Sequence, residues 1–423
     1  MQKSKIYSNA ISILFLTPLR AIVILIAPVL PFLLKKYFHC KANQKIRILY
    51  FVIIVSSLIG LLRGYVDFAN VILYLWICFP IIFLLFGDVR ENVSSVVSWD
   101  ALFRSLRWWL IIIDVCGFIC RFIIFRTVDD FGYAYGAHFK GVSGLSVVNA
   151  FMVLYYLSHL LKGEMSKRII NNFLFFFCSF IFCFSGLTTV TFFVTIILYF
   201  ALNIKPKNLV KTAVLLLLGL FVLIYSAKDV LYYNIRNVEL FLSSEDSQDN
   251  ARKRVMYSNF FNLMASDLSV ASVGVGPGGY NSRTCFLLND DSNNIFTTVL
   301  DHHMPVYHKN DIFPLWNKAV VSFESFTDGA RNKPFSSIVA FGAEVGLVFL
   351  FMFSFYWLKN INKFRKRSNA DSDYLYLYLL NVFMFLLLLT EYWFESSEFV
   401  LFLIIQNTLL ASKKSHKLQI VKS

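Results

Sequence analysis

The sequence has too few charged residues to cover the surface of a soluble protein. Only 16% of its 423 residues are Asp, Glu, Lys or Arg, whereas soluble domains carry about 25%. Hydrophobic residues make up 57%, and the mean hydropathy is +0.61. These values exclude an ordinary soluble chain. They predict that lipid covers much of the exterior, because a membrane-spanning helix needs about 20 mostly apolar residues.

The chain also lacks the cysteine and histidine patterns of disulfide or metal sites. Cys285 is the only cysteine in the long polar segment 227–334, so no disulfide can form within that segment. His302 and His303 follow Asp301, but adjacent histidines in an irregular loop seldom share one metal ion. We therefore expect no metal and no other cofactor. Either histidine is a candidate proton-transfer group, because imidazole titrates near neutral pH.

What the sequence does have is a series of long apolar runs, which predict an all-α fold. If each run is one span, the protein is a polytopic transmembrane helix bundle of 11–12 helices. The number is twelve if Pro18 breaks the first run into a hairpin. The runs cover residues 6–34, 46–62, 71–86, 108–125, 145–161, 169–184, 187–200, 209–225, 335–358, 374–389 and 399–410.

The net charge of +14 comes from basic residues that cluster between these runs. Nucleic-acid binding would need aromatic residues beside the basic ones in soluble segments, and none are evident. The pattern instead follows the positive-inside rule of membrane proteins. It places on the cytoplasmic side the segments 35–47, 161–167, 203–211, 359–367 and 413–417. The opposite, periplasmic side receives 126–144, 227–334 and 391–398.

The chain accordingly divides into three parts. Residues 1–226 form an N-terminal transmembrane bundle, 227–334 one large periplasmic loop subdomain, and 335–423 the last transmembrane helices and a cytoplasmic tail. Within the loop, Asn250 could cap a helix running to about Ser266. The helical spacing of apolar residues predicts one buried face on that helix, made of Tyr257, Phe260, Phe261 and Met264.

The glycine-rich string at 274–280, Gly-Val-Gly-Pro-Gly-Gly-Tyr, is the most distinctive local pattern. It lacks the Gly-Lys-Ser/Thr ending of a phosphate-binding loop and the βαβ context of a dinucleotide fingerprint. It predicts a tight turn in which Gly276 and Gly278 let the backbone approach a neighbour or a ligand closely.

Several charged residues are candidates for chemistry at the periplasmic side. Arg252 and Arg254 lie two positions apart, so they point to different helix faces. One could bind a pyrophosphate while the other faces water, because guanidinium offers paired donors. Arg121 and Arg126 lie near an outer helix end and could reach a phosphate at headgroup level. Asp114 is expected to anchor a neighbouring helix.

Glu344 lies in the apolar run 335–358, roughly 13 Å below Phe335 if that helix is regular. A carboxylate at such a depth is costly unless it is paired or faces water, so it is a functional hypothesis by default. The alternative is a structural partner for an arginine or a backbone group.

Three elements together resemble the O-antigen polymerase and ligase superfamily, and more closely its Wzy-type O-antigen polymerases. They are Arg254 before the glycine turn, the long outer loop, and Ala-Glu-Val-Gly-Leu at 343–347. Residues 136–141 look like the family's shorter outer loop, and 185–189 like its serine turn, although the arginine often found there is missing. The loop ends in Asn-Lys-Pro at 332–334 instead of the His-Asn of ligases, which favours a polymerase.

The resemblance implies a membrane glycosyltransferase that uses neither metal nor nucleotide sugar. An undecaprenyl-pyrophosphate-linked oligosaccharide would be transferred onto the non-reducing end of another lipid-linked repeat unit. Glu344, His302 or His303 would be the base. Arg254, Arg121, Arg126 and Arg331 would stabilise the departing pyrophosphate.

The same resemblance implies a place in the bacterial inner membrane, with an active site that faces the periplasm. Its implied partners are membrane lipid, a flippase and a chain-length regulator. The rival functions are an O-antigen ligase and a polytopic transporter. A transporter predicts internal repeats with helices broken at matching places, and no such repeat is evident.

Overall fold

The computed structural model describes residues 2–23, 40–89, 97–124, 129–136, 141–183, 185–202, 217, 232, 252–289, 300, 302–316, 336–369 and 371–422. These residues are mostly helical, which confirms the all-α class. The one strand pairing in this part of the chain joins β1 (Cys40–Lys41) to β2 (Asp88–Val89) in antiparallel register. Arg126, Arg331, the segment 332–334 and, apart from Leu217, the predicted run 209–225 lie outside the described residues.

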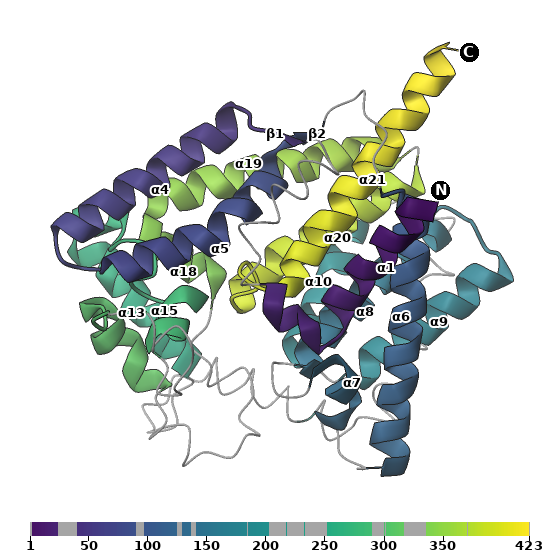
Figure 1. Ribbon diagram of the computed structural model, residues 1–423, viewed down its shortest axis with the longest axis horizontal. Helices are drawn as coiled ribbons and strands as arrows, with labels where there is room; N and C mark the ends of the chain where they lie inside the picture. Colours follow the sequence, from purple (N-terminus) through teal and green to yellow (C-terminus); the bar gives the residue numbers. More distant parts are fainter. Residues whose placement is uncertain are drawn as a thin grey trace.

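The longer helices match most of the apolar runs in order, and Figure 1 shows them as one bundle. They are α1 (Gln2–Leu16), α4 (Gln44–Leu62), α5 (Phe68–Phe86), α6 (Trp99–Ile119), α8 (Gly141–Leu161), α9 (Lys167–Phe182), α10 (Gly186–Leu202), α19 (Leu347–Ser368), α20 (Ser372–Thr390) and α21 (Ser397–Lys422).

Shorter helices lie between them. They are η1 (Pro18–Ile22), η2 (Cys120–Ile124), η3 (Asp129–Gly132), α7 (Tyr133–Gly136), α13 (Arg252–Ser266), α14 (Leu268–Val273), α15 (Arg283–Asn289), η4 (His308–Ile312), η5 (Phe313–Leu315) and α18 (Ser337–Val345).

Among the described residues, the four helices α4, α5, α8 and α20 are long and apolar enough to cross a membrane. Two of them, α4 and α20, begin with a side-chain cap. Asn43 accepts a hydrogen bond from the amide of Ile46 at 3.1 Å, and so satisfies one of the free N–H groups at the start of α4. The protein is therefore a helical chain with membrane-spanning character.

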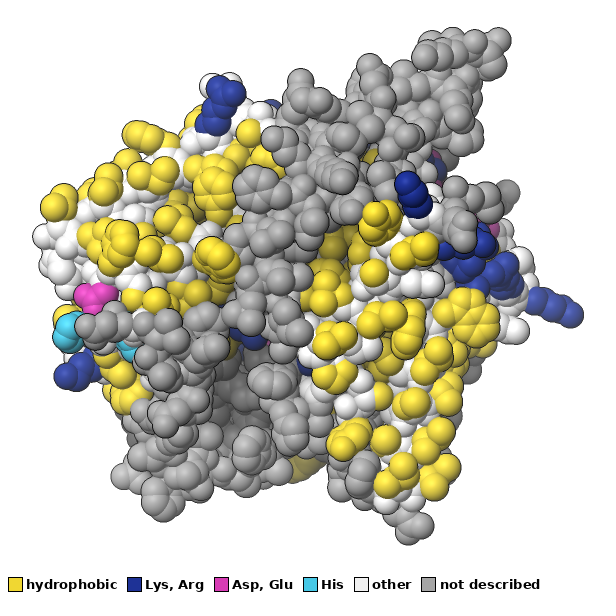
Figure 2. Space-filling view, in the orientation of Figure 1, with side chains coloured by type: hydrophobic (Ala, Val, Ile, Leu, Met, Phe, Trp, Pro, Cys, Tyr) yellow, Lys and Arg dark blue, Asp and Glu magenta, His cyan; other side chains and the backbone are white. Residues whose placement is uncertain are grey.

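The helices form two groups that α20 and α21 join. One group contains α1, α6, α8, α9 and α10, and the other contains α4, α5, α18 and α19 with α13, α14 and α15 against them (Figure 1). Helix α20 contacts α8 and α10 in the first group and α19 in the second. Apolar exposed side chains cover much of the visible described surface of both groups (Figure 2), as lipid contact requires.

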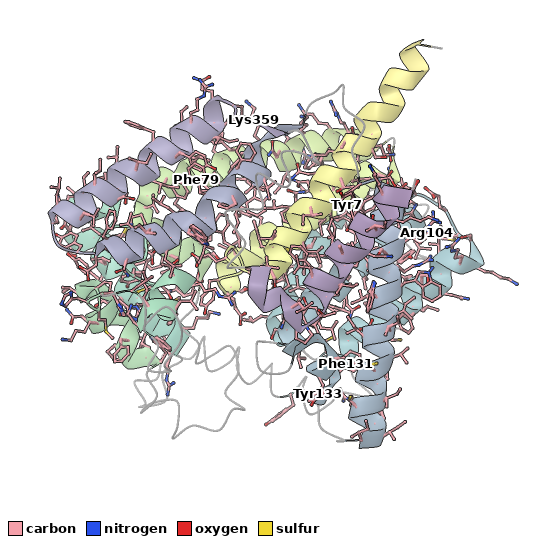
Figure 3. All side chains as sticks on the ribbon, viewed as in Figure 1. Tyr7, Phe79, Arg104, Phe131, Tyr133 and Lys359 are labelled. Carbon is pink, nitrogen blue, oxygen red and sulfur yellow. The ribbon has the colours of Figure 1, made fainter. Side chains whose placement is uncertain are left out.

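The described segments predicted to be cytoplasmic lie together at one end of the bundle, called here the basic end. The Lys162 ammonium group donates to the carbonyl of Asn369 at 2.9 Å, and Lys413 lies 2.7 Å from the carboxylate of Asp371. Ser4 accepts from the amide of Ser98 at 2.9 Å, which brings the start of α1 to the same end. Figure 1 shows both termini there, and Figure 3 labels Lys359 there on α19.

The opposite end, called here the loop end, gathers α7, α13 and α15 (Figure 1). Helix α14 and the turn between α20 and α21 contact α18 beside them. Helix α1 runs from the basic end to the loop end, where Pro18 begins η1. Arg20 of η1 forms a buried ion pair there with Glu398. Cys40 lies back at the basic end, in β1. The second half of the predicted first run, residues 24–34, lies outside the described residues.

The expectation of one regular helix over 335–358 is wrong. The chain breaks at Gly346, whose φ of +93° ends α18 and starts α19. A side chain at Gly346 would clash with the backbone of Ser272, because the end of α14 passes directly over the break. Helix α19 makes the passage to the basic end. Glu344 precedes the break, near the end of the nine-residue α18. Phe335, from which its depth was reckoned, lies outside the described residues.

The buried face of α13 also differs from the expectation. Lys253, Met256, Phe260 and Leu263 are buried, whereas the Phe261 side chain is 64% exposed. Phe260 packs at Gly342 of α18, where its ring leaves no space for a side chain. The face is thus set by contact with α18, which apolar spacing alone did not reveal. The proposed cap Asn250 lies outside the described residues.

Candidate functional site

The glycine turn at 274–280 is attached through its backbone to the end of α18. The amide of Val275 donates to the carbonyl of Ala343 at 2.8 Å, and the amide of Gly276 donates to that of Glu344 at 3.0 Å. Ser56 of α4 donates to the same Glu344 carbonyl at 2.9 Å. These bonds satisfy carbonyls that the break at Gly346 would otherwise leave unpaired.

The Glu344 side chain binds the same turn from inside. Its carboxylate is fully buried and accepts four backbone N–H groups. Gly278 donates to Oε2 at 2.8 Å. The other three donors reach Oε1, at 3.0 Å from Tyr280 and 2.8 Å from both Asn281 and Ser282. Of the two interpretations of Glu344, the structure thus shows the backbone partner, and this carboxylate fixes the path of the chain between the turn and α15.

Gly276 and Gly278 have φ of +107° and +75°, a region that favours glycine. An added Cβ would lie 2.7 Å from the side chain of Val66 at Gly276, and 2.9 Å from the carbonyl of Asn70 at Gly278. Asn70 in turn donates to the Gly278 carbonyl at 2.8 Å. The backbone therefore closely approaches the corner between α4 and α5, a neighbour within the protein.

Glu395 is a second buried carboxylate at this place, and the sequence did not single it out. It comes from the turn between α20 and α21 and accepts from the amide of Thr284 at 3.0 Å. The Cys78 thiol of α5 lies 3.7 Å from its other oxygen. Burial, and then the nearby charge of Glu344, raise the pKa of Glu395 to about 8. Two carboxylates thus bind the backbone at the start of α15.

The cationic residues of α13 face this region from the loop end. Lys253 is buried and contacts the carbonyl of Thr390, at the end of α20. Arg252 donates to the carbonyl of Leu315 at 3.4 Å, and Arg254 is half-buried. The sequence pointed to the two arginines, but the lysine between them makes the deepest contact. An aliphatic stem with a polar tip permits such burial.

His303 forms a solvent-accessible pair with Asp67. Its side chain is 90% exposed, and its Nδ1 lies 3.2 Å from the carboxylate of Asp67, which also accepts the His303 amide. His302 instead places its Nδ1 2.9 Å from the carbonyl of Leu300. Asp67 was not a candidate from sequence, although its position just before α5 was a recognisable helix-start signal. A carboxylate that binds one ring nitrogen of an imidazole fixes the orientation of the ring.

Other groups surround this pair at the corner between α4 and α5. The Tyr65 and Tyr307 rings meet edge to face with centroids 5.1 Å apart. Arg63 lies over the Tyr65 ring at 5.8 Å and donates to the Ser269 hydroxyl at 2.7 Å. We call this set the corner surface: Arg63, Tyr65, Asp67, His303 and Tyr307. Acidic, histidine and basic side chains lie close together at the left edge of Figure 2, beside α4 and α13.

His308, unlike the exposed His303, has a structural role. It is buried, with Nδ1 2.6 Å from the carbonyl of Tyr280 at the end of the glycine turn. The rings of Phe286 and Trp316 lie 5.5 and 6.1 Å away. Burial lowers the pKa of His308 to about 4. This histidine therefore holds the 302–316 segment against the turn in its neutral form.

Arg121 lies in the other group of helices. It stands on η2 after α6, donates to the carbonyl of Phe182 at 3.0 Å and packs on the Phe182 ring at 5.2 Å. The structure thus does not bring Arg121 to the glycine turn. Nearby, Asp114 accepts from Asn149 of α8 at 2.9 Å, which confirms its expected role as an anchor between helices.

The described residues include no group of three or more His, Cys, Asp or Glu side chains that could hold a metal ion. No family model matches the chain, and no curated protein matches it. The fold and composition define a class, a helical membrane protein with a built polar site at its loop end.

Proposed function

We propose that the protein is an O-antigen polymerase of the bacterial inner membrane. It would transfer an undecaprenyl-pyrophosphate-linked glycan to the non-reducing end of a second lipid-linked repeat unit, at the periplasmic face. The proposal rests on the sequence resemblance and on a polar site at the loop end of an apolar helix bundle. A lipid carrier could reach such a site from the bilayer while its glycan stays in water.

The observation that carries the enzymatic part is the Asp67–His303 pair. A glycosyl transfer without metal needs a base for the acceptor hydroxyl, within reach of water-soluble substrate. His303 is exposed and is oriented by a carboxylate. Glu344 is fully buried and each oxygen already accepts backbone N–H groups. We therefore assign the base to His303 and a positioning role to Glu344.

The reaction then proceeds as one displacement. The acceptor hydroxyl oxygen attacks the anomeric carbon of the donor glycan. The proton of that hydroxyl moves to Nε2 of His303. The bond between the anomeric carbon and the pyrophosphate oxygen breaks, and undecaprenyl pyrophosphate leaves with the electron pair. Arg254 on α13 and Arg63 on the corner surface would stabilise that leaving group, because guanidinium pairs well with phosphate oxygens.

The lipopolysaccharide gel profile of a deletion strain tests the proposal. A strain without the polymerase should keep single-repeat caps and lose the ladder. Complementation with His303→Ala should leave the ladder missing at normal protein level, whereas the matched control Lys309→Gln, an exposed residue of the same segment, should restore it. An unchanged ladder in the deletion strain would exclude the function.

The two rival functions predict other outcomes. A ligase uses the same chemistry, but its loss would remove both caps and ladder. A transporter gains some support from the helix break at Gly346, because broken helices often form ion sites. Here, however, the carbonyls of Ala343 and Glu344 at the break already accept amides of the glycine turn. The protein's own glycine turn therefore occupies the carbonyls that an ion would bind, which favours the enzyme over the transporter.

A further inference from the structure

A separate pocket lies at the basic end of the bundle, on the side opposite to the corner surface. It encloses about 330 Å³ between the first turns of α6, the last turns of α8 and the start of α9. That volume is in the range of small-ligand sites, about 300–1,000 Å³. Its lining residues are Trp99, Asp100, Phe103, Arg104, Arg107, Tyr155, Tyr156, His159, Glu164, Arg168, Ile169 and Asn172.

The lining of the pocket carries charges of both signs. Arg107 and Arg168 are basic, and Asp100 and Glu164 are acidic. The rings of Tyr155 and Tyr156 meet edge to face in the same lining, with centroids 5.3 Å apart. Arg104 adds a third guanidinium to the lining, and Figure 3 labels it beside α6 and α9.

Two nitrogen atoms of the lining are buried without a hydrogen-bond partner among the described residues. They are Nε of Arg107 and Nε2 of His159. The other ring nitrogen of His159 lies 2.8 Å from the carboxylate of Glu164. Buried polar groups are normally paired. Nε of Arg107 is always a donor, so it points to a ligand that supplies oxygen atoms.

The residues around the pocket have the composition of a membrane surface region. It opens beside the α8–α9 turn, where Lys162 meets the α19–α20 turn. Apolar helices extend from it toward the loop end, and Trp108 of α6 exposes its ring one turn below Arg104. Exposed tryptophan and basic residues at a helix end are typical of the headgroup region of a bilayer.

We propose that this pocket binds the headgroup of an aminophospholipid, with its phosphate on Arg104, Arg107 and Arg168 and its ammonium group on Asp100 and Glu164. A zwitterionic headgroup offers a negative charge to the arginines and a positive charge to the two carboxylates. A purely anionic headgroup would have no positive charge for the carboxylates. Basic pockets between helices at this level hold lipid phosphates in other membrane proteins. The site is independent of the proposed glycosyl transfer.

Binding of a short-chain phosphatidylethanolamine to the purified, detergent-solubilised protein tests this, with thermal stabilisation as the readout. We expect it to bind more tightly than short-chain phosphatidylglycerol and than inorganic phosphate. Arg107→Gln should weaken it by about tenfold, as loss of a charge-assisted bond implies. The matched control Lys366→Gln, an exposed cation of the same end, should leave it unchanged.

A second measurement uses the unaltered protein, in case Arg107→Gln does not fold. Phenylglyoxal modifies accessible arginines, and mass spectrometry locates the modified positions. Phosphatidylethanolamine should protect Arg104 and Arg168 but not Arg367, which lies outside the pocket. Equal protection of all three arginines, or affinity for phosphatidylethanolamine no higher than for phosphatidylglycerol or phosphate, would overturn the proposal.

Discussion

Replacing Glu344 by Gln separates a positioning carboxylate from a catalytic one. Gln has the same shape, but it is neutral and one of its two ends is a donor. If its oxygen takes the place of Oε1, it still accepts from Tyr280, Asn281 and Ser282. Its NH₂ group then faces the amide of Gly278, which the native Oε2 accepts at 2.8 Å. Two donors oppose each other there.

The magnitude follows from these four bonds. Hydrogen bonds to a charged group contribute about 1.5–3 kcal/mol each and neutral ones about 0.5–1.5, so three retained bonds lose roughly 1 kcal/mol each. The unsatisfied amide of Gly278 costs about 1–3 kcal/mol more. The neutral Gln no longer has to be buried as a charge, and this gain offsets part of the loss. A net loss on the order of 3 kcal/mol remains, a large share of the 5–15 kcal/mol by which proteins are stable.

The assay is protein abundance in the membrane together with thermal unfolding of the purified protein in detergent. Glu344→Gln should lower both, and Glu344→Asp should do so too, because the shortened side chain withdraws from the four amides. Loss of polymer should parallel loss of folded protein. Normal abundance and normal unfolding temperature with no polymer formed would refute the positioning role and return Glu344 to the role of base.

Three further predictions concern stability. Arg20→Ala should cost about 3–5 kcal/mol, because it leaves Glu398 charged and buried; unchanged thermal unfolding would contradict the ion pair. Gly278→Ala should lower the unfolding temperature more than Gly64→Ala. Both glycines have positive φ, but only Gly278 lies against a backbone carbonyl, so equal effects would contradict the close approach. Glu395 has a pKa raised from 4.5 to about 8, so its stabilising neutral form is fully present below about pH 4.5. That contribution falls as the pH rises through 8. Glu395→Gln should flatten this part of the stability–pH curve, and an unchanged curve would show that Glu395 does not titrate there.

The helical fold follows from the sequence because each apolar run is long enough for at least three helical turns. Most of the described runs are helices. The break at Gly346 did not follow, since its cause is α14, which passes over that glycine and is distant in sequence. The tight turn at Gly276 and Gly278 was predicted, but its partner, the α4–α5 corner, was not.

The candidate site was only partly predictable for the same reason. His303 was recognised by residue type, whereas its partner Asp67 is 236 positions away and resembled an ordinary helix cap. Glu344 was singled out correctly as an unusual carboxylate. Its partners are backbone amides, and these cannot be predicted from residue types because every residue except proline has one. Glu395 is buried by contacts with α5 and α15, which are distant in sequence, and from sequence its turn was predicted only to be a periplasmic segment.

The polymerase proposal is tested most directly by reconstitution of the purified protein in lipid vesicles with one lipid-linked repeat unit, an undecaprenyl-pyrophosphate oligosaccharide. Mass spectrometry of the products should show glycans of two, three and more repeats on the carrier. Each linkage formed should release one undecaprenyl pyrophosphate, and neither added metal nor nucleotide sugar should be needed. The His303→Ala protein should leave the repeat unit unchanged. Unaltered substrate with the folded wild-type protein would contradict the account.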